Sequence, residues 1–126
     1  MTFSDPELLP GVEGNLQEIP QEGIELQPGK LYLGHTEEML GSRRFASSLI
    51  GRSTLGRLGL WLQVTADLGH TGTYHRWTLE MKVVQPLRVY AGMPIGQICF
   101  WRVRGARNRY VGKYRGDMSV MQSRLL

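Results

Sequence analysis

Short apolar stretches separated by turn-forming residues recur along most of this chain. The clearest is RWTLEMKVV at residues 76–84, where four apolar side chains alternate with polar ones: Trp77, Leu79, Met81 and Val83. Alternation with a period of two is typical of a strand that buries one face and exposes the other. Similar stretches lie between Gly, Pro and Asn residues at 24–26, 30–34, 45–50, 60–65, 87–90 and 95–103. This spacing predicts an all-β sandwich or barrel.

One segment has a helical pattern instead. In GRSTLGRLGL, residues 51–60, Leu55 and Leu58 stand three positions apart, as on one face of a helix. Ser53 can cap the N-terminus and Gly59 can end the helix. The pattern therefore predicts a helix of one or two turns among the strands.

The length of 126 residues predicts a single domain with one modest core. Residues 1–22 are rich in Pro, Gly, Glu and Gln without periodic apolar positions, and are expected to form an extended arm. Regular structure should begin near residue 23 and continue to 106. Residues 107–126 form a basic tail.

Neither a membrane span nor a signal peptide is expected. No apolar run approaches the roughly 18 residues that a membrane helix needs. The opening MTFSDPELLP has neither the basic nor the apolar region of a signal peptide. These features favour a cytoplasmic protein.

Charge is distributed unevenly along the chain. Residues 1–42 hold eight acidic side chains and one basic one, whereas residues 43–126 hold fourteen basic and three acidic ones. The basic part is expected to attract an anion: a nucleic acid, nucleotide phosphates, or the acidic part of a neighbouring chain. Cys99 is the single cysteine, which excludes an internal disulfide and a Cys-rich zinc site.

Two groups of residues have the composition of a reactive site. Gly51, Arg52, Ser53 and Thr54 bring a cation and two hydroxyls to the start of the predicted helix, which suits a phosphate; the alternative is a capped surface helix with solvated arginines. Glu80 is one of three acids after residue 42 and lies mid-strand on the polar face. It could act as a general base, or be an exposed residue paired with its neighbour Lys82.

The histidines and the C-terminal tail remain open to several interpretations. The spacing of His35, His70 and His75 fits no compact metal motif. Tyr110 and Lys113 lie among arginines, so the tail could cover a phosphate ligand, bind nucleic acid or remain solvated.

Taken in order, these segments resemble the dCTP deaminase branch of the dUTPase-like superfamily. GRSTLGRLGL resembles the family signature usually written GRSSLARLGL, and VTA at 64–66 and WTLE at 77–80 follow at the family spacing. The other matching segments are EGIELQPGKLYLGHTEE, LRVYAGMPIGQICF and YVGKYRG. The resemblance covers about residues 20–124.

The resemblance implies a distorted, dUTPase-like β-barrel (β-clip) that assembles as a homotrimer with active sites between subunits. It implies zinc-independent hydrolytic deamination of dCTP to dUTP and ammonia, with Mg²⁺ carried by the nucleotide triphosphate. A deoxycytidine nucleotide is then the expected anionic ligand, in preference to nucleic acid.

The resemblance also assigns roles to individual residues. Glu80 would shuttle the proton of the attacking water, and Ser53 and Arg57 would orient that water and the base. The family's nucleotide-binding positions correspond here to Arg52, Ser53, Thr54, Leu55, Gly56, Arg57, Val64, Ala66, His70, Thr78, Leu79, Glu80, Tyr110, Lys113 and Asp117. Among them, the backbone around residues 64–66 would contact the edge of the base, and Thr78 and Leu79 would line the sugar pocket. Tyr110 and Lys113 would belong to a C-terminal lid over the phosphates.

Two positions depart from the family pattern and leave other functions to consider. His70 stands where the family has an aspartate that contacts the sugar and, in dUTP-hydrolysing relatives, helps to activate water. Asp117 stands where the lid often has glutamine. The alternative function is a non-catalytic module that senses nucleotides or binds protein or nucleic acid. A dUTP diphosphatase ranks third, because the aspartate is missing.

Overall fold

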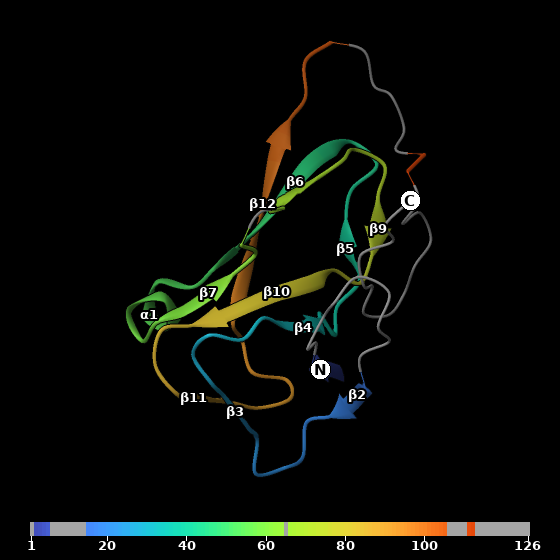
Figure 1. Cartoon of the computed structure of the whole chain (residues 1–126). Helices are drawn as coiled ribbons and strands as arrows, with labels where there is room; N and C mark the ends of the chain where they lie inside the picture. The colour runs from blue at the N-terminus through green and yellow to red at the C-terminus, as the bar shows by residue number, and fades with distance from the viewer. Residues whose placement is uncertain (1, 6–14, 65, 106–110, 113–126) are drawn as a thin grey trace.

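The computed structural model describes residues 2–5, 15–64, 66–105 and 111–112, with side chains from residue 17 onward. This part of the chain consists of short strands and one short helix (Figure 1). In chain order the elements are β1 (Thr2–Asp5), β2 (Asn15–Glu18), β3 (Ile24–Leu26), β4 (Tyr32–His35), β5 (Leu40–Gly41), β6 (Phe45–Gly51), α1 (Ser53–Arg57), β7 (Leu60–Leu62), β8 (Leu68–Gly69), β9 (Tyr74–His75), β10 (Thr78–Val83), β11 (Leu87–Val89) and β12 (Gly96–Arg102). The predicted dUTPase-like β fold with one short helix is confirmed.

The strands pair antiparallel into four sheets. The largest has the order β2-β1-β4-β10-β7, and a second has the order β12-β6-β8. Two strand pairs, β11-β3 and β5-β9, complete the described part. In Figure 1, α1 lies beyond the tip of β10, beside β7, while β6 and β12 form a long ribbon. β10 thus lies between β4, the central strand of the largest sheet, and β7, which follows the helix.

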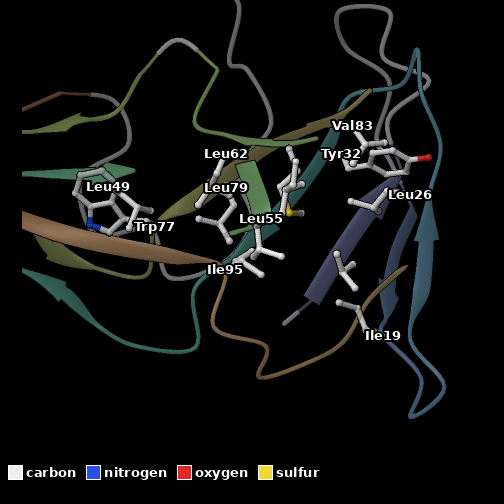
Figure 2. Close-up of a cluster of buried hydrophobic side chains, with 13 residues drawn as sticks. Ile19, Leu26, Tyr32, Leu49, Leu55, Leu62, Trp77, Leu79, Val83 and Ile95 are labelled. Atoms are coloured by element: carbon white, nitrogen blue, oxygen red, sulfur yellow. The ribbon is translucent and has the colours of Figure 1, made fainter. Parts of the chain in front are cut away.

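The alternation along β10 has the predicted effect on burial. Leu79, Met81 and Val83 are buried, and Trp77 just before the strand is buried with them. Figure 2 shows this cluster, to which most of the sheets contribute. Its members are Ile19, Leu26, Tyr32, Leu49, Leu55, Leu60, Leu62, Trp77, Leu79, Met81, Val83, Val89 and Ile95. The polar face of β10, with Thr78, Glu80 and Lys82, is turned away from this core.

β1 and β2 are strands within residues 1–22, for which we predicted an extended arm. β1 and β2 pair from Thr2 with Glu18 to Asp5 with Asn15, and β1 also pairs with β4 through Phe3 and Gly34. The edge of β4 offers main-chain hydrogen-bonding groups to any extended segment, so a strand can form there without a periodic apolar pattern. Regular structure thus begins before residue 23.

Helix α1 begins differently from the prediction and ends as predicted. Its N-cap is Arg52, with no side-chain cap hydrogen bond, so the prediction that Ser53 caps the helix is wrong. Ser53 is already the first helical residue, where its hydroxyl is not in the capping position. At the other end, Gly59 follows the C-cap Leu58 with a φ of +90°, a conformation that glycine adopts without strain.

Candidate active site

Glu80 lies mid-strand on β10 and is half-buried. Across the ladder, Leu33 of β4 is directly opposite Glu80, and His35 is opposite Thr78. Residues directly opposite one another in an antiparallel pair share a face, so His35 lies on the same face as Glu80. His35 is buried, and its Nδ1 lies 2.9 Å from the carbonyl oxygen of Thr36. A carboxylate and an imidazole thus occupy one face of the sheet.

The other neighbour of β10 is β7, which is followed by the segment predicted to contact the base. Val64 and Ala66 in this segment are both exposed. Gln63 connects it to Glu80: the Gln63 amide donates to the carbonyl oxygen of Glu80 at 2.9 Å, and the Glu80 amide donates to Oε1 of Gln63 at 3.0 Å. Nε2 of Gln63 donates to the carbonyl oxygen of Ala66 at 3.3 Å.

Gln63 was not among the residues predicted from the sequence. Its φ of +57° makes it the one non-glycine residue with a positive φ among those the structure describes. Residue type does not signal this conformation, because a left-handed backbone is expected of glycine, asparagine or aspartate rather than glutamine. Its position directly before VTA was the only available signal.

The predicted phosphate-binding residues form the exposed surface of α1. Ser53, Thr54, Gly56 and Arg57 are exposed, so solvent and any ligand can reach them. Leu55 is buried in the core, so its side chain is not available to a nucleotide and only its backbone could contribute.

Arg52 contacts the loop before β12. Its Nη1 donates to the carbonyl oxygen of Pro94 at 3.1 Å, and its amide donates to the carbonyl oxygen of Ile95 at 3.3 Å. The side chain is exposed, so other guanidinium nitrogens can meet a ligand. Arg52 thus has a defined anchor before any anion binds.

Glu80 and α1 lie toward different ends of the β7-β10 pair. Leu60, just after the helix, is opposite Val83, whereas Glu80 bonds to Gln63 at the far end of β7. Three residues along a strand span roughly 10 Å. The strand register of one chain therefore separates Glu80 from the helix along β10.

The remaining predicted residues lie in three different settings. Thr78 is half-buried on the face of Glu80, as expected. Leu79 points to the core, because alternation along the strand places it on the opposite face; its side chain therefore does not share a face with Thr78, with which it was predicted to line the sugar pocket. His70 is exposed in the turn between β8 and β9, and its carbonyl oxygen accepts from Oγ1 of Thr73 at 2.7 Å. Tyr110, Lys113 and Asp117 lie outside the described residues.

A pocket of about 380 Å³ opens on the opposite side of β10 from Glu80. Leu40, Leu49, Leu62 and Leu79 form part of an apolar wall, and Glu37 and Glu38 also line it. Leu79 is the predicted site residue that reaches this pocket. The pocket is thus separate from the face that carries Glu80.

Two further properties of the described residues bear on the predictions. They contain no group of three or more His, Cys, Asp or Glu side chains that could hold a metal ion. No helix among them is long and apolar enough to cross a membrane.

Comparison with known proteins identifies the family. Residues 13–103 match the model of the dCTP deaminase-like family. The chain belongs to this family. The match includes β10 with Glu80, α1 with the phosphate signature, and the segment between them that contains Gln63. The predicted family resemblance is therefore confirmed.

Relatives in the dCTP deaminase-like family are similar over most of this chain. A protein of Leptospira biflexa is 44% identical over 108 residues, which is 85% of this chain and 62% of that protein. One of Hathewaya histolytica is 44% identical over 85% of this chain and 63% of its own length, and one of Clostridium botulinum is 43% identical over 83% and 61%. This chain thus spans about 62% of the length of the curated relatives that it matches.

All three relatives are named dCTP deaminase, dUMP-forming. The names contradict our prediction of dUTP as the product. That prediction treated deamination and cleavage of the phosphate chain as alternatives, and used the absence of an aspartate at position 70 to set cleavage aside. One position was too little to decide between the two products.

Proposed function

We propose that this chain catalyses the hydrolytic deamination of dCTP and releases dUMP. The observation that carries the proposal is the half-buried carboxylate of Glu80, which lies mid-strand on the polar face of β10 with its backbone bonded to Gln63. Charged residues are unfavourable in strands, so a carboxylate in this position calls for a functional reason. The names of the relatives support both the substrate and the product.

In the deamination step, Glu80 is the general base and then the general acid. It accepts a proton from the water that adds to carbon 4 of the cytosine ring, and returns it to the amino group, which leaves as ammonia. Such proton transfer contributes about 10²–10⁴-fold to a rate. Val64 and Ala66 are both exposed, and Gln63 connects Ala66 to Glu80, so this part of the chain can contact the edge of the base.

Formation of dUMP requires a second hydrolysis. A second water attacks the α-phosphorus and breaks its bond to the bridging oxygen of the β-phosphate, so that diphosphate leaves. One dCTP and two waters then yield dUMP, diphosphate and ammonia. We propose that Arg52 and Thr54 hold the phosphates, which is supported by the exposure of both side chains at the start of α1. We propose that Mg²⁺ arrives bound to the triphosphate as part of the substrate.

We further propose that the active site is completed between copies of the chain in a homotrimer. Ser53 and Arg57 lie at the helix end of the β7-β10 pair, roughly 10 Å along the strand from Glu80. A second copy could bring its own helix to the Glu80 face. The exposed aromatic side chain of Trp61, which lies opposite Lys82 next to this face, supports a contact there.

Ammonia release and product chromatography with Mg²⁺ and dCTP test the activity. The wild-type protein should release one ammonia for each dUMP, without accumulation of dUTP. Glu80→Gln should lower kcat by at least about 100-fold and leave dCTP binding nearly unchanged, because the amide cannot accept the proton. Glu25→Gln is the control, since Glu25 lies on β3 in an exposed ion pair with Arg88.

Two outcomes would contradict the proposal. Full turnover by Glu80→Gln would exclude Glu80 as the proton shuttle. No ammonia from any deoxycytidine nucleotide, with folded wild-type protein, would exclude the deaminase activity itself.

A further inference from the structure

Gln63 lies at the point where β7 leaves the largest sheet. Leu62 is opposite Met81, so the next pair along the ladder is Gln63 with Glu80. In a regular antiparallel ladder, such a hydrogen-bonded pair exchanges two main-chain bonds, each amide donating to the carbonyl of the other residue. The first of these bonds is present, from the Gln63 amide to the Glu80 carbonyl.

The second bond is made by a side chain. The Glu80 amide donates to Oε1 of Gln63, at 3.0 Å, where the ladder would use the main-chain carbonyl of Gln63. The positive φ of Gln63 turns the chain out of the strand at this residue. The side-chain amide therefore replaces the main-chain carbonyl and extends the ladder by one residue to Glu80.

The same amide group also contacts the segment that leaves the sheet. Nε2 of Gln63 donates to the carbonyl oxygen of Ala66, with a distance of 3.3 Å. One planar group thus joins the backbone of Glu80 to the backbone of Ala66. The oxygen and nitrogen of the Gln63 side-chain amide are held in one plane. A shift of Ala66 would therefore be transmitted through this group to the backbone of Glu80.

We infer that Gln63 is a positioning residue, which fixes the backbone of Glu80 and orients the 64–66 segment beside it. This inference rests on the proposed function, in which Glu80 transfers the proton and the segment contacts the base. A displacement of about 1 Å in a reacting group can lower a rate by about 100-fold. The contacts of Gln63 act on the two elements whose spacing matters most for the reaction.

Gln63→Asn is the decisive variant. Asparagine tolerates a positive φ better than most residues, so the backbone can keep its conformation, while the shorter side chain cannot reach both partners. We expect kcat for ammonia release to fall by about 10- to 100-fold, with a smaller change in KM, because Glu80 acts in the chemical step. Gln27→Leu is the matched control, since Nε2 of Gln27 bonds only to the exposed Glu25 side chain among the described residues.

A second measurement does not depend on activity. Hydrogen exchange of the Glu80 amide, followed by NMR, should be at least about tenfold faster in Gln63→Asn than in the wild type. In Gln63→Glu, which keeps an acceptor oxygen at the same reach, the Glu80 amide should stay protected. A general loss of stability would instead raise exchange at many amides of β10.

The outcomes separate this inference from the proposed function. An active wild type, with unchanged kcat and unchanged Glu80 exchange in Gln63→Asn, would overturn the inference and leave the function in place. An inactive wild type with the expected exchange pattern would refute the function and support the contacts of Gln63. The expected result in both measurements supports the inference and the function together.

Discussion

Glu80 and the α1 signature are positioned by different means. Glu80 is bonded through its backbone on β10, a strand whose other face is buried in the core, and the side chain of Gln63 adds to the ladder at that residue. In α1, Ser53, Thr54 and Arg57 are exposed on a helix of five residues, where Leu55 alone is buried. One chain thus fixes the backbone of Glu80, while these side chains of the helix remain exposed to solvent.

This difference agrees with the roles that we propose for Glu80 and for α1. A rigid carboxylate suits proton transfer, which depends on alignment, whereas exposed cations and hydroxyls suit a charged ligand that arrives from solvent. If the helix of a second copy completes the site, the exposure of α1 in one chain is expected.

The largest predicted change in activity tests whether Glu80 and the α1 residues of one site come from different chains. Glu80→Gln and Arg57→Ala should each be nearly inactive alone. Refolded together in equal amounts, they should recover roughly a quarter of the wild-type activity, because random assortment in a cyclic trimer gives that share of sites with both residues intact. Ammonia release measures the recovery. A mixture as inactive as its components would place both residues of a site in one chain.

Strand β10 and the position of Glu80 on it could be predicted from the sequence. The alternation in residues 76–84 is strong because β10 has one buried face, and it correctly gave the core positions from Trp77 to Val83. Glu80 was found because a carboxylate is unusual in such a strand. Pattern alone could not give β5, β8 and β9, since strands of two residues have no period to detect.

Side-chain contacts were harder to predict than strands. Leu55 and Leu79 were predicted to bind the nucleotide, but both are buried in a cluster that includes residues of β7, β10 and the loop before β12. Gln63 could not be found because its role depends on a positive φ and on the register of β7 with β10. The local sequence indicates neither the positive φ nor the register, because both belong to the folded chain, in which β7 pairs with β10.

A change in stability of intermediate size is expected to distinguish two glycines, Gly56 and Gly59, in residues 51–60. A Cβ at Gly59 would collide with Cγ2 of Val84, and the φ of +90° is unfavourable for alanine, so Gly59→Ala should lower the free energy of unfolding by about 1–3 kcal/mol. Gly56→Ala should raise it by about 0.5–1 kcal/mol, because the space is open and alanine favours a helix. Urea denaturation at fixed protein concentration measures both. If the two substitutions changed the free energy of unfolding by the same amount, the end of α1 would not be constrained by Val84, the residue after β10.

The smallest effect is expected at Ser53. Since its hydroxyl makes no cap hydrogen bond, Ser53→Ala should change the free energy of unfolding by less than about 0.5 kcal/mol, compared with about 1 kcal/mol for a typical cap. Thr36→Val is the contrast, because the buried Thr36 hydroxyl accepts from the Trp77 amide and donates to the Glu38 carbonyl; it should cost about 1–3 kcal/mol. Urea denaturation again provides the measurement. If Ser53→Ala lowered the free energy of unfolding as much as Thr36→Val, the Ser53 hydroxyl would stabilise the fold. Its proposed role would then not be limited to contact with a ligand.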